Sequence, residues 1–129
     1  MAAALLRILR VACGIFFLAI GLAILGWLLT GVGSPPTQPN PAAQAFTDAL
    51  SRSGFIDPLL AISYVMGGAA LLRDRTAPLG LVVLAPSIAV ITMFHLFLSG
   101  QWPIGLVVAL VFGALALAYR TRLAALWTA

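Results

Sequence analysis

Charged residues are scarce in this sequence, and their scarcity excludes an ordinary soluble domain. Only 8% of the 129 residues are charged, whereas 63% are hydrophobic. A soluble domain has roughly a quarter of its residues charged, and a chain this short would be mostly surface if it folded as a globule. In a membrane, lipid surrounds the apolar side chains, so the surface does not need to be covered by charged residues. The composition therefore predicts one integral membrane domain covering residues 1–129.

The side chains that perform catalysis or bind metals are also few. Cys13 is the only cysteine and His95 the only histidine, so an internal disulfide and a CxxC or haem-attachment motif are excluded. The sequence contains no glycine-rich phosphate loop and no nucleophile triad. Its three acidic residues lie at the edges of apolar runs, which disfavours an ion-coupled transporter with an acid near the membrane midplane. We expect no metal site and no catalytic residue that works alone, and leave open whether the chain takes part in an enzyme.

What the sequence does contain is four long apolar stretches, at about 11–30, 55–72, 77–98 and 103–119. A helix rises 1.5 Å per residue, so about 20 residues cross a ~30 Å hydrocarbon core. The first and third stretches reach that length. The second and fourth are shorter, and they would cross with little tilt or in a locally thinned bilayer. We predict an all-α, membrane-spanning, antiparallel four-helix bundle whose short loops make the last three spans neighbours.

The positions of the arginines predict the orientation. With four spans, six of the seven arginines fall on one side, and Arg52 alone falls on the other. The positive-inside rule then places both termini in the cytoplasm of a multi-pass protein of the bacterial inner membrane. These arginines and their contact with anionic lipid account for the net charge of +4 without a nucleic acid partner. The first apolar run exceeds the ~7–15 residues of a signal-peptide core, so we expect it to remain as a span.

The predicted outer loop, residues 31–54, divides into an extended part and a short helix. Four of the eight residues at 34–41 are proline, which favours an extended, polyproline-like chain. The helix begins at Pro41, with Asn40 as its N-cap and Gly54 as its stop signal. Its apolar face predicts an interfacial helix on the outer leaflet, and consists of Ala42, Ala45, Phe46, Ala49 and Leu50.

Small residues recur at helical spacing on the predicted spans. Such residues let helix backbones approach closely in lipid, within the bundle or against another subunit. The predicted packing positions are Gly14, Gly21, Ser63, Gly67, Gly105, Ala109 and Gly113.

The third apolar stretch holds the residues with the greatest chemical potential. Pro86 interrupts it and predicts a kink. One helical face beyond that proline contains Ile88, Thr92, His95 and Ser99.

His95 is an ionisable group at membrane depth and therefore the first functional candidate. Three uses stay open from the residues alone: a structural hydrogen bond, contact with a quinone or a proton, and ligation of a metal or haem. The last would need donors from a second subunit. Our candidate quinone or proton contacts are His95, Thr92 and Tyr64.

The order of these features resembles the DoxX-like family of small four-helix bacterial membrane proteins. The resemblance extends over most of the chain and is strongest in the segment from Ala85-Pro86 to Phe94-His95-Leu96-Phe97-Leu98. Two polar positions differ. Tyr64 stands where the family often has a glutamate, and Val90 where it often has an asparagine.

The resemblance implies a link to membrane redox systems, including a quinone-reducing thiosulfate oxidoreductase and oxidase-associated subunits. Since the two polar positions have changed, we expect a small non-catalytic accessory subunit of a larger membrane complex linked to electron transfer or quinone. The alternative is a quinone-interacting oxidoreductase subunit that uses His95, and the third hypothesis is a small transporter or channel. We expect no cofactor bound by the chain alone. Quinone, lipid, or a pigment or haem shared with a partner subunit remain open.

Overall fold

The computed structural model describes residues 1–128, and these residues form helices joined by short loops, with no strand among them. Two long apolar elements are α1 (Ala2–Thr30) and α4 (Ala77–Met93), the latter continued by the π-helix η1 (Phe94–Leu98). Between them lie α2 (Pro41–Arg52) and α3 (Ile56–Leu72), and the chain ends with α5 (Trp102–Ala118) and α6 (Arg120–Ala125). The all-α prediction is confirmed.

Two of these helical segments are long and apolar enough to cross a membrane. They are α1, with 29 residues, and the continuous segment Ala77–Leu98, with 22. A third is obtained if α2 and α3, which meet at 91°, are taken as one broken span. Helices α3 and α5 have 17 residues each, or about 26 Å at 1.5 Å per residue, which is less than a ~30 Å hydrocarbon core. Four spans therefore remain a prediction.

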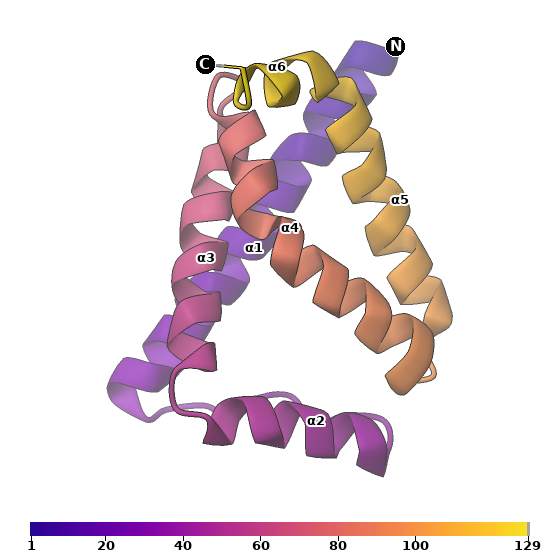
Figure 1. Ribbon diagram of the computed structural model, residues 1–129. Helices are drawn as coiled ribbons and strands as arrows, with labels where there is room; N and C mark the ends of the chain where they lie inside the picture. The colour runs from indigo at the N-terminus through magenta and orange to yellow at the C-terminus, as the bar shows by residue number, and fades with distance from the viewer. Residues whose placement is uncertain (129) are drawn as a thin grey trace.

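The helices pack in chain order, except that α1 lies mainly against α3. Helix α3 contacts α4, α4 and η1 contact α5, and α1 touches α5 more sparsely. Figure 1 shows α1 alongside α3, and α4 turning away from α3 along its length to meet the lower end of α5. Pro86 lies inside α4, where a proline removes a backbone hydrogen bond and bends the helix.

The interior of the packed helices is apolar. The most buried large side chains are Leu71 of α3, Leu84 of α4 and Leu115 of α5. Phe17 of α1 packs edge-on against Tyr64 of α3, with ring centroids 5.2 Å apart. Large apolar side chains also cover much of the outer surface of the helices, as expected where the surrounding medium is lipid.

Local sequence signals account for the ends of the outer helices. Helix α1 ends at Gly31, which adopts φ 69° and donates its N–H to the Trp27 carbonyl, a conformation that glycine tolerates best. Asn40 caps α2 by accepting a hydrogen bond from the Ala43 N–H at 2.9 Å, and Pro41 opens that helix. Gly54, with φ 78°, lies just beyond its end. The predicted cap, first residue and stop are thus present.

Two elements were not predicted. No element was predicted after residue 119, where the chain forms α6. The stretch 94–98 was expected to continue an ordinary helix, but it forms η1, whose wider turn is closed by the Ser99 N–H donating to the Phe94 carbonyl at 2.9 Å. Single π-helical turns carry a recognisable geometry but no simple sequence signal, and they are frequent at functional sites.

Figure 1 also shows where the ends of the molecule lie. Both termini and α6 occupy one end, whereas α2 runs across the opposite end. A pocket lies toward each of these ends: a groove beside α2, and a cleft near the termini.

Candidate functional site

The groove beside α2 has a volume of about 450 Å³ and is enclosed by α2, α3, α4 and η1. Its walls are mainly aliphatic and aromatic. The polar side chains that reach it come from three helices and one π-turn, and they are Thr47, Ser63, Tyr64, Ser87 and His95. A mostly apolar pocket with a few converging polar groups is the usual form of a small-molecule site.

The groove unites two of the three residues that the sequence indicated as quinone or proton contacts. His95 of η1 and Tyr64 of α3 both line it. Thr92, the third, is 7% exposed and does not line the groove; its carbonyl lies instead where α5 approaches α4 at Gly105. The Cβ of His95 lies near Gly105 as well, so this part of the helix packs on α5, while the His95 side chain also lines the groove.

His95 is held by a neighbour one turn further along. Its Nδ1 lies 3.1 Å from the Ser99 hydroxyl, and that hydroxyl oxygen also accepts the Gln101 N–H at 3.2 Å. The hydroxyl oxygen can accept from Gln101 and still exchange a hydrogen bond with Nδ1 in either direction. Nε2 is the ring nitrogen that this contact leaves without a partner.

The Tyr64 hydroxyl lies close to the Ser87 hydroxyl, across the contact between α3 and α4. Ser63, also on the groove, donates to the Leu59 carbonyl of its own helix at 2.8 Å. Ser63 was predicted to pack helices together; in the structure it is a groove residue whose hydroxyl satisfies its own backbone.

Helix α2 closes one side of the groove, and Asn40 fixes it there. The Asn40 side chain caps α2 through its oxygen, while its Nδ2 donates to the Leu98 carbonyl at the end of η1 at 3.0 Å. Phe46 of α2 then packs on Phe94 of η1 with centroids 5.7 Å apart. Sequence reasoning found the cap but not the bond to Leu98, because that carbonyl is 58 residues away.

The apolar face predicted for α2 is only partly the one that packs. Phe46 and Leu50 line the groove, but the most buried residue of the helix is Ala43, at 0% exposure. Ala43 belongs to the first turn of α2, which the bond from Asn40 to the Leu98 carbonyl holds next to η1.

The predicted small-residue positions fall into two groups. A methyl group added at Gly14 or Gly21 would approach α3 backbone oxygens within 2.9 Å, and one added at Gly105 would lie 2.9 Å from the Thr92 carbonyl. A methyl group added at Gly67 would lie 2.5 Å from the Leu84 side chain. By contrast, a methyl group on Gly113 would meet nothing within 4 Å, and Ala109 is half-buried.

Two further close approaches were not predicted. A methyl group on Gly68 would lie 2.5 Å from the Leu18 nitrogen, and one on Gly80 would lie 2.8 Å from the Gly67 carbonyl. Gly68 could have been found, since it directly follows Gly67 and falls on the face that opposes Gly14.

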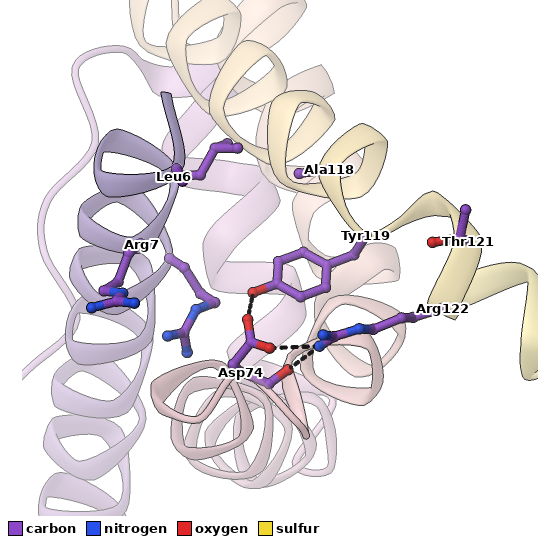
Figure 2. A pocket seen from close by; sticks show the side chains of 9 residues that line it. Leu6, Arg7, Asp74, Ala118, Tyr119, Thr121 and Arg122 are labelled. Atoms are coloured by element: carbon purple, nitrogen blue, oxygen red, sulfur yellow. Dashed lines mark hydrogen bonds and ion pairs between the residues drawn. The ribbon is translucent and has the colours of Figure 1, made fainter. Parts of the chain in front are cut away.

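The cleft at the other end of the molecule has a volume of about 530 Å³. It lies between α1, the turn after α3, and the region joining α5 to α6 (Figure 2). Asp74 accepts hydrogen bonds from the Tyr119 hydroxyl and from Arg122, the latter at 2.6 Å. Arg7 and Arg10 of α1 line the same cleft.

Asp74 attaches α6 to the turn between α3 and α4, and this attachment depends on pH. The hydrogen bond from Tyr119, and then that from Arg122, holds the pKa of Asp74 below its ordinary value of 3.8. A lowered pKa in the folded protein stabilises it above that ordinary value, and the contribution is lost as the pH falls through the folded pKa. We expect the attachment of α6 to weaken as the pH falls below 3.8.

The weakening can be followed by the fluorescence of Trp127, next to α6, during titration from pH 6 to acid, in a protein whose other two tryptophans are replaced by phenylalanine. Asp74→Asn should remove the transition. Asp48→Asn changes an exposed carboxyl on α2 and should leave it in place. A transition that persists in Asp74→Asn would show that another group controls α6.

The fold and the two sites define a class: an all-helical protein with helices apolar enough to span a membrane. Among residues 1–128, no three His, Cys, Asp or Glu side chains are grouped as a metal site would require. No family model matches the sequence, and neither a curated protein nor a solved structure matches the chain. The proposals below therefore depend on geometry.

Proposed function

We propose that this protein is a small membrane subunit that binds a lipophilic ligand of the quinone class in the groove between α2, α3, α4 and η1. One observation carries the proposal: the fold brings His95 and Tyr64, 31 positions apart in the sequence, to the same largely apolar groove near one end of the helices. A quinone combines hydrogen-bond-accepting carbonyls with an apolar tail. The groove has polar side chains that can bond the carbonyls and apolar walls that can contact the tail.

The polar groups match the ligand's head. The His95 ring and the Tyr64 hydroxyl can each donate a hydrogen bond to a carbonyl oxygen. The aliphatic and aromatic walls suit the rest of the molecule. The Tyr64 ring also packs on Phe17, so its hydroxyl is held by a rigid side chain.

The membrane arrangement is part of the proposal. We infer four spans, formed by α1, α3, α4 with η1, and α5, in a bacterial inner membrane with both termini in the cytoplasm. The positive-inside rule supports this orientation. So does the position of both termini at the end opposite α2 (Figure 1). Helix α2, at 91° to α3, then lies along the outer surface of the bilayer, and the groove opens at that level.

The proposal includes a partner assembly. Reduction or oxidation of a quinone needs an electron donor or acceptor, so we propose that the chain is an accessory subunit of a larger membrane complex linked to electron transfer. This agrees with the resemblance of the segment around Pro86 and His95 to the DoxX-like family. The expected role of this chain is to hold the ligand.

Binding of a short-chain ubiquinone to the purified protein in mild detergent tests the proposal. We expect His95→Gln and Tyr64→Phe each to weaken binding by about three- to tenfold, the effect of one lost hydrogen bond. Thr92→Val changes a buried residue outside the groove and should leave the affinity unchanged. Calorimetric titration gives the dissociation constants.

The control separates a specific site from partitioning into detergent. The same titration with the apolar tail alone, decane, should give no saturable binding. Equal affinities of the native protein, His95→Gln and Tyr64→Phe for the quinone would overturn the proposal, as would the absence of saturable binding.

A further inference from the structure

The cleft near the termini carries more positive charge than its own residues neutralise. Three arginines line it, Arg7, Arg10 and Arg122, against a single carboxylate, Asp74. In the part of the chain that the structure describes, the ion pair between Arg122 and Asp74 is the one present. Both oxygens of that carboxylate are engaged, one by Tyr119 and one by Arg122. Arg7 and Arg10 therefore form no ion pair with this carboxylate, although Arg10 lies near enough for its charge to contribute to the lowered pKa of Asp74.

Arg10 is the unusual member of the cleft. It is only 6% exposed, although arginine is seldom buried unless it is paired. Its Nη1 donates to the Leu71 carbonyl at 2.5 Å, at the end of α3. This bond anchors the side chain but brings no negative charge. A guanidinium has five N–H groups, so most of the Arg10 donors are not used by the bond to Leu71. Arg10 lines the cleft, where these donors can meet a ligand.

The walls of the cleft are suited to an amphipathic molecule. Leu6 and Ala3 of α1 face Ala118 of α5 across it, and the arginines and Tyr119 supply the polar part. Figure 2 shows Leu6 and Ala118 on the side of the cleft away from Arg122, with Tyr119 and Asp74 between the two helices. An apolar side and a cationic side thus meet in one cavity.

We infer that this cleft binds the phosphate group of an anionic ligand, with Arg10 and Arg7 as the donors. Guanidinium groups form strong, paired hydrogen bonds with phosphate oxygens. Arg10 is fixed in place before the ligand arrives, which reduces the entropy lost on binding. The phosphate belongs either to the headgroup of a phospholipid, whose acyl chain lies along Leu6 and Ala118, or to a small soluble phosphate.

The test uses the full chain in a neutral maltoside detergent with three probes: phosphatidylglycerol, phosphatidylcholine and inorganic phosphate. Native mass spectrometry counts bound molecules, and titration gives the affinity. We expect phosphatidylglycerol to bind more tightly than phosphatidylcholine, whose phosphate is neutralised by its own choline. Competition by inorganic phosphate at millimolar concentration would assign the site to phosphate alone, whereas its absence would assign it to the lipid.

Matched variants separate the cleft from general attraction to arginines. Arg7→Gln removes an exposed side chain and should weaken phosphatidylglycerol binding about tenfold, the effect of losing hydrogen bonds from a charged donor. Arg10→Gln should weaken it at least as much. Arg75→Gln removes an exposed arginine outside the cleft and should have no effect. If Arg7→Gln and Arg75→Gln bind equally, or if phosphatidylcholine binds as tightly as phosphatidylglycerol, the inference is wrong.

Discussion

Gly68→Ala is expected to lower the free energy of unfolding by about 2 kcal/mol. The added methyl group would lie 2.5 Å from the Leu18 nitrogen and 2.8 Å from the Gly14 carbonyl. Both are backbone atoms of α1, so no side chain can rotate away, and the two helices must separate. Overpacking of this kind costs up to about 3 kcal/mol, from which the higher helix propensity of alanine recovers about 1 kcal/mol.

Gly113→Ala is the matched control, since it makes the same change in an apolar helix. A methyl group at Gly113 would meet nothing within 4 Å, so only the propensity term remains, and we expect the variant to be as stable as the native protein or more so by about 1 kcal/mol. Denaturation in detergent, followed by circular dichroism, measures both. Equal stability of Gly68→Ala and the native protein would show that α1 and α3 are not packed as closely as described.

Asn40→Ala is expected to release α2 from the rest of the molecule. The substitution removes the cap on Ala43 and the hydrogen bond to the Leu98 carbonyl together. A lost N-cap costs about 1 kcal/mol, and a lost hydrogen bond costs about as much again. Local opening of α2 should then become roughly 25-fold more frequent, which hydrogen exchange of the amides in α2 measures directly.

Asn40→Ser separates the two contributions. Serine caps helices about as well as asparagine, but it is shorter and has no amide to reach Leu98, so we expect about half of the free-energy change. Exchange in α5, which does not depend on Asn40, should stay the same in both variants. Native-like exchange in Asn40→Ser would show that the bond to Leu98 contributes nothing. Native-like exchange in Asn40→Ala would reject both contributions.

Asn40 also connects the fold to the proposed function. Helix α2 supplies Phe46, Thr47 and Leu50 to the groove, so a molecule whose α2 has opened has lost one wall of that groove. Ligand binding should therefore weaken in Asn40→Ala even though Asn40 does not line the groove. This effect differs from that of His95→Gln, which removes a donor and leaves the wall in place.

The local features of this chain could largely be predicted. The ends of α2 follow from Asn40, Pro41 and Gly54, because caps and stops depend only on neighbouring residues. The apolar stretches correspond to α3, α4 with η1, and α5 within a few residues, whereas α1 begins well before the predicted first stretch, at Ala2. In contrast, α6 was missed, because its attachment to Asp74 joins residues 48 positions apart.

In the candidate site, too, locally determined features could be predicted and contacts between distant residues could not. His95 and Tyr64 were predicted as candidates because polar groups in apolar stretches are conspicuous. Thr92 was predicted with them, because it shares regular helical spacing with His95, but it is buried against α5 and does not line the groove. Asn40 and Ser99, which hold the groove together, could not have been assigned these roles from sequence, because a hydrogen bond to a distant carbonyl has no local signature.

By itself, the sequence determined that this protein is helical, that its helices suit a membrane, and that only a few polar side chains lie among them. Composition and periodicity carry this information because the hydrophobic effect and the backbone's need for hydrogen bonds act on every residue in the same way. Only the tertiary structure decided which polar groups meet. It brought His95 and Tyr64 to one groove and buried Arg10 beside a cleft, because the close approach at Gly14, Gly21 and Gly68 and the course of α4 set where each helix face points.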